Sequence, residues 1–199
     1  NAGASYGWST SETSQTISVS ASGDYSVVVT DANTCTATDT VSVTINTIPT
    51  VNLGSDVTQC GGSVTLDAGN AGAAYGWSSS ETSETITVSA SGDYAVTVTN
   101  AGNCSASDTV SVTINTIPTV TLSLNIDTAC SNGATVALSG GSPAGGFYFG
   151  AGVSSGNFDP TSVSTGNNTI YYGYMNNAGC ADTASAVVVV RVCTGIQTP

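Results

Sequence analysis

Apolar and polar residues alternate along most of this chain, in short runs rich in Val, Ile, Thr and Tyr. Clusters of Gly, Asn, Asp and Ser separate these runs. A period of two puts one face of each run in a core and the other in water, which is typical of half-buried β-strands. The alternation predicts an all-β chain, with strands at residues 51–53, 63–68, 74–77, 84–88, 94–99 and 109–114.

The same pattern returns 69 residues further along the chain. The recurring positions are Trp8 and Trp77, Tyr25 and Tyr94, Cys35 and Cys104, and Pro49 and Pro118. Residues 44–51 return letter for letter as residues 113–120. A period of about 70 residues is too long for a solenoid unit and fits a complete small β-sandwich of the immunoglobulin type. We call residues 1–48, 49–117 and 118–199 the first, second and third repeats.

The predicted fold is therefore a series of tandem immunoglobulin-like β-sandwich modules, one for each repeat. The third repeat is divergent and ends in a C-terminal tail. Its predicted elements are strands at residues 135–138, 169–174 and 186–192, a loop at 140–146 and a turn at 176–179.

The first repeat matches only the later part of the second. It has no counterpart of residues 49–69, which hold the first two predicted strands. A sandwich without those strands exposes unpaired backbone and apolar core. Two explanations are open: the chain is part of a longer array, or another subunit supplies a strand by β-augmentation.

Charge and composition exclude several classes of partner. The net charge is −12, from 13 acidic residues against the single base Arg191, and Lys and His are absent. Proteins that bind nucleic acid neutralise phosphates with Lys and Arg, so neither nucleic acid nor an anionic membrane surface is an expected partner. The sequence shows no signal peptide and no run apolar enough for membrane insertion. Because Asn1 opens in the middle of the repeat pattern, we expect upstream sequence to have been removed.

Six cysteines, with no His and no C-x-x-C pair, favour disulfides in an extracellular, oxidising setting over a zinc site. They are Cys35, Cys60, Cys104, Cys130, Cys180 and Cys193. In one pairing each repeat closes on itself, through Cys60–Cys104 and Cys130–Cys180. This pairing leaves Cys35 and Cys193, and a bond between them in successive subunits would build a covalent head-to-tail fibre.

A second pairing follows from strand direction. In an immunoglobulin-type sandwich the first turn and the last hairpin turn lie at opposite poles. A strand of about seven residues separates them by about 23 Å, which is beyond disulfide reach. Cys60 would then bond to Cys180 in the next repeat, and Cys130 to Cys193. Cys35 and Cys104 would need partners upstream or in another chain.

Four segments of the second repeat carry recognisable motifs, namely CGGSVTLDAG at 60–69, YGWS at 75–78, SGDY at 91–94 and GNC at 102–104. They resemble the Ig-like and PKD-like tandem repeats of Bacteroidota secreted cell-surface proteins, although no Asp-Phe-Gly-Asp-Gly follows either Trp. Residues 140–146 and 156–160 resemble a sister repeat of the same proteins. The resemblance implies a surface stalk, adhesin or fibre. It also implies type IX secretion, with residues 193–196 at the junction before a sorting domain that is removed on export.

Catalysis has little raw material in this sequence. Without His or Lys, no ordinary base can activate a Ser nucleophile. The acidic residues lie in turns and at strand edges and form no catalytic pair. We therefore predict that the protein is not an enzyme and has no cofactor. Calcium is a candidate cation for the acidic turn residues, although the sequence contains no D-x-D-x-D-G loop. The simpler interpretation is that these acidic side chains lie in solvated turns. The candidate calcium ligands are Asp24, Asp31, Asp93, Asp127 and Asp159.

Several aromatic and Thr residues are candidates for other roles. Trp8 and Trp77 fit the buried aromatic of a sandwich, and Tyr25 and Tyr94 fit its tyrosine corner. A third-repeat cluster is the predicted contact surface, since alternate members must face outward; it comprises Phe147, Tyr148, Phe149, Tyr171, Tyr172 and Tyr174. Four Asp-Thr pairs resemble the Bacteroidota O-glycosylation motif, although Asp-Thr can simply begin a strand. The acceptors would be Thr40, Thr109, Thr128 and Thr183.

The function predicted from these features is structural. The chain would be a repeat segment of an extracellular fibre, stalk or filament at the cell surface. Its partners would be other copies of itself or neighbouring repeats of a longer chain. The alternative is an adhesin or carbohydrate-binding module that binds its ligand through the third repeat. A fibre subunit should self-associate end to end, whereas an adhesin should stay monomeric and retain a ligand.

Overall fold

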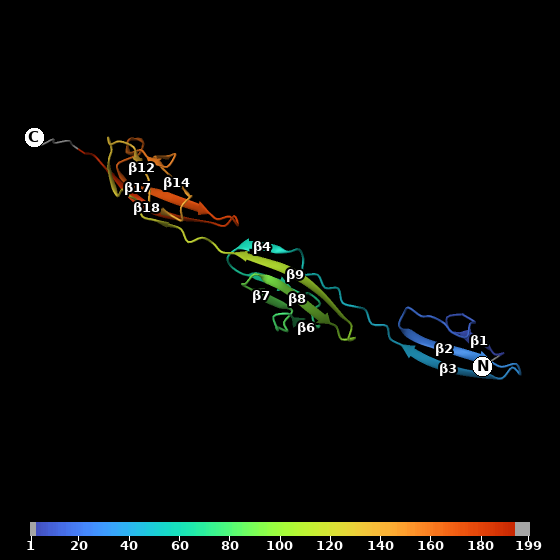
Figure 1. The fold of residues 1–199 in the computed structure, drawn as a ribbon. Coiled ribbons are helices and arrows are strands. Elements are labelled where there is room, and N and C mark those ends of the chain that lie inside the picture. The colour runs from blue at the N-terminus through green and yellow to red at the C-terminus, as the bar shows by residue number, and fades with distance from the viewer. Residues whose placement is uncertain (1–2, 194–199) are drawn as a thin grey trace, which may run out of the picture. The chain divides into compact units, whose positions relative to one another are not determined.

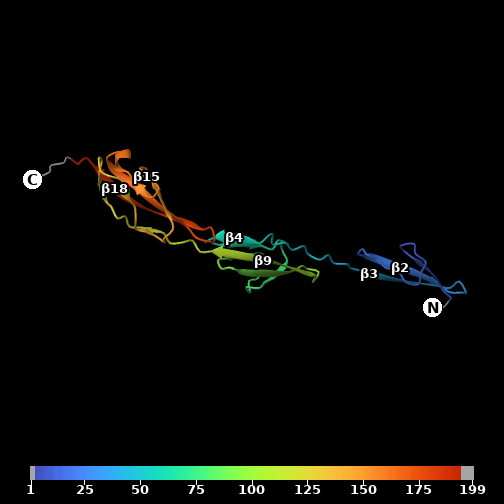
Figure 2. The same cartoon turned by 45° about the horizontal axis from the view of Figure 1, so that its top comes forward.

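The computed structural model describes residues 3–193, and the regular secondary structure among them is almost entirely β-strand. The helical segment among them is a single 3₁₀ turn, η1 (Pro160–Ser162). Figures 1 and 2 show the strands of the first repeat in blue, those of the second in cyan to green and those of the third in yellow to red. Each sheet draws its strands from one repeat. No helix in the described part of the chain is long and apolar enough to cross a membrane.

The first repeat forms one three-stranded antiparallel sheet, in the order β1-β2-β3. Its strands are β1 (Ser5–Trp8), β2 (Gly23–Thr30) and β3 (Thr36–Val43). Trp8 pairs with Val27, and Tyr25 pairs with Val41, so the apolar side chains gather on one face of the sheet. None of the described residues of this repeat is buried.

The second repeat contains a four-stranded and a two-stranded sheet, in the orders β4-β9-β8-β6 and β5-β7. The strands are β4 (Val57–Cys60), β5 (Val64–Asp67), β6 (Ala74–Trp77), β7 (Thr85–Val88), β8 (Gly92–Thr99) and β9 (Ser105–Asn115). Alternate residues of both sheets are buried, as a sandwich requires. The prediction of a first strand at residues 51–53 is wrong. Gly54 adopts a φ of 85°, which breaks the extended run, and pairing begins at Val57.

The third repeat contains sheets in the orders β11-β18-β17-β14, β12-β16-β15 and β10-β13. The long strands are β17 (Gly166–Met175) and β18 (Ala181–Arg191). The short ones are β10 (Thr121–Leu122), β11 (Thr128–Cys130), β12 (Val136–Ala137), β13 (Gly141–Ser142), β14 (Phe147–Gly150), β15 (Val153–Ser154) and β16 (Asn157–Phe158). The core comprises Ala129, Leu138, Phe158, Ile170, Val188 and Val190.

The second and third repeats share the feature that positions their cysteines. In each, a short strand ending in Cys runs parallel to the last long strand: Cys60 pairs with Asn115, and Cys130 pairs with Arg191. The last long strand also lies beside the long strand that precedes it in the sequence: β9 neighbours β8, and β18 pairs antiparallel with β17. The chain therefore has the predicted fold, with tandem immunoglobulin-like β-sandwiches.

Candidate functional site at the repeat junctions

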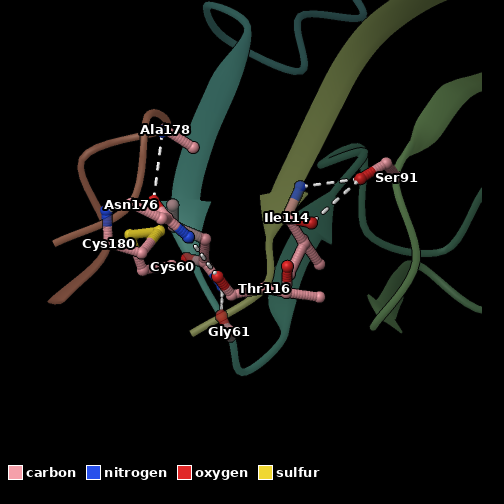
Figure 3. The surroundings of a disulfide bond; sticks show 9 residues. Cys60, Gly61, Ser91, Ile114, Thr116, Asn176, Ala178 and Cys180 are labelled. Carbon is pink, nitrogen blue, oxygen red and sulfur yellow. Dashed lines mark hydrogen bonds between the residues drawn. A yellow bond between two sulfur atoms is a disulfide. The ribbon is translucent and has the colours of Figure 1, made fainter. Parts of the chain in front are cut away.

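A disulfide joins the second repeat to the third (Figure 3). Cys60 stands at the end of β4, and Cys180 closes the turn between β17 and β18. The Cα atoms of the two residues are 5.5 Å apart, although 120 positions separate them in the sequence. Cys180 is fully buried, whereas Cys60 is exposed, so the bond joins a surface position of the second repeat to a buried position of the third.

Asn176 holds the turn that presents Cys180 (Figure 3). Its side-chain Oδ1 accepts hydrogen bonds from the backbone N–H groups of Ala178 and Cys180, both at 3.0 Å. This Asx turn fixes the backbone of the cysteine locally. The other half of the same amide reaches across the junction, because Nδ2 donates to the carbonyl oxygen of Thr116 at 2.9 Å. One side chain thus orients the cysteine and ties its turn to the linker between the repeats.

Hydrogen bonds within the second repeat also fix the backbone around Cys60 and the linker. The Gly61 N–H donates to the Asn115 carbonyl at 2.8 Å, which continues the ladder between β4 and β9 past Cys60. The Ser91 hydroxyl bonds to both backbone groups of Ile114, at 2.8 and 3.2 Å. Gly61 has a φ of 58°, and a Cβ there would lie 2.9 Å from the Ile117 side chain. A larger residue would displace the Ile117 side chain, and the positive φ itself favours glycine at this position.

The junction between the first and second repeats has the same design, without a disulfide. Asn100 Oδ1 accepts from the N–H groups of Gly102 and Cys104 at 3.0 and 3.1 Å. Its Nδ2 donates to the Thr47 carbonyl at 2.6 Å. Thr47 is the counterpart of Thr116, 69 residues earlier. Cys104 lies where Cys180 lies in the third repeat, with its Sγ 3.9 Å from the carbonyl oxygen of Asn46.

The turn of the first repeat differs in one residue. Asp31 occupies the position of Asn100 and Asn176, and its Oδ1 accepts from the N–H groups of Asn33 and Cys35, both at 2.8 Å. A carboxylate forms the Asx turn as well as an amide, but it has no N–H to donate to a linker carbonyl. Cys35 is exposed and, like Cys104, is outside the two disulfides.

The second disulfide, Cys130–Cys193, closes the third repeat on itself, with Cα atoms 5.4 Å apart. The structure thus has the second of the two predicted pairings. Self-closure through Cys130–Cys180 is wrong because these residues lie beside opposite ends of β18, whose eleven residues extend about 33 Å. The predicted bond between Cys35 and Cys193 of successive subunits is also wrong, because Cys193 is already bonded. The predicted sorting-domain junction lies, beyond Cys193, outside the described residues.

The predicted aromatic contact surface separates into an exposed and an enclosed set. Phe147, Phe149 and Tyr171 are 62%, 39% and 38% exposed. Phe149 stacks on Tyr171 with ring centroids 5.2 Å apart. Tyr172 is buried, so its place in a contact surface is wrong: its hydroxyl donates to the Pro143 carbonyl at 2.6 Å and accepts from the Gly146 N–H at 2.8 Å.

The other two members of that aromatic set are partly buried. Tyr148 packs against the core of the third repeat, and its hydroxyl accepts from the Gly141 N–H at 2.9 Å. Tyr174 is half-buried near the end of β17. Alternation along β14 and β17 explains the division, since successive side chains point to opposite faces of a sheet. The exposed face therefore carries Phe147, Phe149 and Tyr171.

The remaining candidates lie where simple structural roles explain them. Trp77 is buried and donates from Nε1 to the Ser83 carbonyl at 2.8 Å. Tyr94 donates to the Ala90 carbonyl at 3.0 Å, as a tyrosine corner does. The four candidate O-glycosylation acceptors, Thr40, Thr109, Thr128 and Thr183, are all exposed on strands.

The candidate calcium ligands do not gather into a site. Among the described residues, no three Asp, Glu, Cys or His side chains are placed to hold a metal ion. Asp159 instead caps η1. Hydrogen bonds from the hydroxyl and the backbone N–H of Thr161 lower the pKa of its carboxyl group below the ordinary value of 3.8.

Sequence reasoning missed the two residues that orient the junction cysteines. Asn176 was predicted only as the first residue of a turn. The signal was present, because each Asn stands four positions before a Cys, and Asp31 keeps the same spacing before Cys35. An Asx turn alone could be expected from that spacing. The Nδ2 bond to a linker carbonyl could not, because it joins residues 53 and 60 positions apart.

Comparison with known proteins gives structural likeness alone. No family model matches the chain, and no curated protein sequence matches it. Titin domains I67–I69 superpose with a TM-score of 0.45 at 12% identity, covering 98% of this chain and 89% of that one. Extracellular domains 3–5 of Drosophila OTK give 0.39 at 13% identity, covering 86% and 72%. The insect immune protein hemolin gives 0.37 at 10% identity, covering 85% and 56%.

Proposed function

We propose that the chain is a structural segment of an extracellular stalk or fibre, in which a disulfide links the second immunoglobulin-like repeat to the third. The observation that carries this proposal is the Cys60–Cys180 bond, which connects two successive repeats instead of closing either one. Disulfides persist in oxidising compartments outside the cytosol, so the two bonds indicate an extracellular protein. The role is passive, and no catalytic step is assigned to any residue.

The disulfide changes how the chain carries tension. Force applied to the two ends passes from the first repeat into Cys60, across the disulfide to Cys180, and on along β18. The intervening segment is bypassed, because the covalent path through sulfur is shorter than the path through 120 residues. Even if the bypassed segment unfolds, the bond keeps its ends together. A stalk built in this way lengthens less when the bypassed segment opens.

Single-molecule force spectroscopy tests the load-bearing role. The Cys60→Ser, Cys180→Ser double variant keeps the Cys130–Cys193 bond, so its covalent path runs along the backbone from residue 60 to residue 130 instead of from residue 180 to residue 193. This path is longer by about 200 Å, at roughly 3.5 Å per residue. We therefore expect the oxidised chain to reach full extension about 200 Å earlier than the double variant. Equal extension of the two chains would contradict the proposal. The single variant Cys35→Ser is the matched control, since it leaves both disulfides intact and should extend like the parent.

The proposal extends to the source, the export route and the glycosylation of the protein. We propose a Bacteroidota surface protein exported by type IX secretion, on the strength of the motif resemblance at residues 60–69 and 91–94. O-glycans on Thr40, Thr109, Thr128 and Thr183 would shield exposed strands from proteases. Mass spectrometry of the native protein tests both points. A mature C-terminus close to residue 196 and hexose-bearing peptides at these threonines are expected, and unmodified peptides with an intact downstream domain would contradict them.

End-to-end association and neighbouring repeats of a longer chain are both compatible with this role. Size-exclusion chromatography with light scattering, without reductant, distinguishes them. A polymer ladder that dithiothreitol collapses would support covalent association of separate subunits. A monomer would place the neighbouring repeats in the same polypeptide.

The alternative function, an adhesin or carbohydrate-binding module, has one observation in its favour. Phe147, Phe149 and Tyr171 form an exposed aromatic surface on β14 and β17, and exposed rings of this kind stack on sugar faces or bury apolar ligands. A glycan array tests it with Phe149→Ala. Binding that this variant loses and Val187→Ala retains would favour the adhesin, because Val187 is 46% exposed on the neighbouring strand β18.

A further inference from the structure

The first repeat repeats the core of the second without burying it. Seven inward positions hold the same residue type in both repeats, and in the second repeat each is at most 6% exposed. The pairs are Trp8 and Trp77, Ile17 and Ile86, Val19 and Val88, Val27 and Val96, Val29 and Val98, Val41 and Val110, and Val43 and Val112. In the first repeat none of the seven is buried, and Val41 is 53% exposed. These residues form an apolar face of the kind that a sandwich normally covers.

Beside this apolar face, two segments of the first repeat are not strands although their counterparts in the second repeat are. Residues 44–46 and 113–115 have the same sequence, Thr-Ile-Asn. In the second repeat these residues continue β9, because β4 pairs with them in parallel. In the first repeat the strand ends at Val43. Residues 16–19 likewise form no strand, whereas their counterpart β7 pairs with β5. Identical residues therefore change structure according to whether a partner strand is present.

An open groove marks where the covering strands would lie. It has a volume of about 170 Å³ and is lined by Trp8, Ile17, Val19, Tyr25, Val41 and Val43. In the second repeat, Leu66 of β5 pairs with Ile86, the counterpart of Ile17, and is 3% exposed. A strand placed on residues 16–19 as β5 is placed on β7 would bring a leucine to this groove.

Cys104 points to the same occupant. At the second junction, the turn cysteine is bonded to the cysteine that ends the short parallel strand of the preceding repeat. At the first junction the turn, the Asx hydrogen bonds and the bond from Asn100 to the linker are all in place. The carbonyl of Asn46, which corresponds to the acceptor of the Gly61 N–H, lies 3.9 Å from the Cys104 sulfur. Every part of the junction is present except the strand and its cysteine.

We propose that the first repeat binds a two-strand segment with the pattern of residues 49–69, and that the cysteine of this segment forms a disulfide with Cys104. The first strand of the segment pairs in parallel with residues 43–46, and the second covers the groove. The occupant is a segment of the repeat type itself, because residues 57–60 and 64–67 of the second repeat pair with the counterparts of these same positions. A second copy of this chain does not fit, because its strand-end cysteines, Cys60 and Cys130, are both already bonded.

The covalent step is an ordinary thiol–disulfide exchange. The Cys104 thiolate, or that of the segment, attacks a small-molecule disulfide such as oxidised glutathione and releases one reduced glutathione. The second thiolate then attacks the mixed disulfide and releases another. One sulfur–sulfur bond forms, two protein thiols lose two electrons, and the small disulfide gains them. The binding surface does not depend on the load-bearing role, so either proposal can fail without the other.

The test restores the missing segment in register. The chain is extended so that a second copy of residues 49–69 precedes Asn1, which is the counterpart of Asn70. After oxidation with glutathione, peptide mass spectrometry identifies the partner of the added cysteine, and alkylation measures the free thiols. We expect the added cysteine on Cys104, Cys35 free, and the Trp8 fluorescence shifted to shorter wavelength as that side chain becomes buried.

Two valines provide matched variants on opposite faces of one sheet. Val41 lines the groove, whereas Val28 pairs with Thr38 on the other face and is 40% exposed. Val41→Asp should slow formation of the Cys104 bond at least about tenfold, because the segment would bury a charge. Val28→Asp should leave the rate unchanged. Both positions are exposed in the unextended chain, so both variants should fold.

Three results would overturn the proposal. The first is an added cysteine that bonds equally to Cys35 and Cys104, which would show capture without docking. The second is a Cys104 that stays as reactive toward alkylation as it is in the unextended chain. The third is a Cys104–Cys104 dimer of the unextended chain that forms as fast as the extended chain closes, which would assign the surface to a second copy.

Discussion

Val110 and Val41 are valines at equivalent positions of the second and first repeats. Because the groove leaves only Val41 uncovered, we expect truncation to alanine to be costly at Val110 and nearly neutral at Val41. Val110 is 1% exposed in the second repeat, and Val41 is 53% exposed in the first. Val110→Ala removes two buried carbon atoms, at about 0.8 kcal/mol each for transfer, and leaves a cavity. We expect it to lower the free energy of unfolding of the second repeat by about 2 to 3 kcal/mol. Val41→Ala should change that of the first repeat by less than about 0.5 kcal/mol.

Urea unfolding followed by tryptophan fluorescence separates the two repeats, because each holds one tryptophan. A Trp8→Phe background reports the second repeat through Trp77, and a Trp77→Phe background reports the first through Trp8. The midpoint shift multiplied by the slope gives the change in free energy. If Val41→Ala costs as much as Val110→Ala, the first repeat is already covered and the reasoning is refuted. In the chain extended by residues 49–69, the two substitutions should become equally costly.

Three further predictions concern single side chains. Asn176→Asp removes the donor to the linker carbonyl, worth about 1 kcal/mol. It should speed reduction of the inter-repeat disulfide by dithiothreitol, whereas Asn168→Asp, whose amide bonds only within its own turn, should not. Tyr172→Phe should lower the melting temperature of the third repeat, since its hydroxyl makes two hydrogen bonds; Tyr171→Phe, on an exposed ring, should not. Because the pKa of Asp159 is lowered on folding, its stabilisation is present above about pH 3.8 and is lost as the pH falls below that value, so Asp159→Asn should flatten the acid limb of thermal unfolding.

Much of the architecture could be predicted from alternation and strand direction. Residues 74–77 form β6 as expected. The Cys60–Cys180 pairing follows from placing the first turn and the last hairpin turn at opposite poles. Both inferences rest on local geometry that a strand imposes on its own residues. The alternation pattern is sufficient to predict features that a strand's own residues determine, such as its position and the direction in which it runs.

Other features depend on partners that a local pattern does not contain. Thr44 to Asn46 and Thr113 to Asn115 are the same three letters, yet only the second set forms strand, because β4 lies beside it. The first strand was placed at 51–53 instead of 57–60 for a related reason. Apolar residues occur in both stretches, and the pairing register of β9 decides between them. Tyr171 and Tyr172 are adjacent tyrosines, and the pairing of β17 within its sheet determines that Tyr172 faces the core.

Disulfide mapping of the native, unreduced protein would show whether the cysteines join successive repeats or close each repeat on itself. The digest needs a protease other than trypsin, which has a single site in this chain, after Arg191. We expect Cys60 joined to Cys180, Cys130 joined to Cys193, and Cys104 joined to a cysteine in a segment that resembles residues 49–69. A native Cys60–Cys104 bond would contradict the covalent link between the second and third repeats, and Cys104 recovered as a free thiol would contradict the docking of a segment on the first repeat.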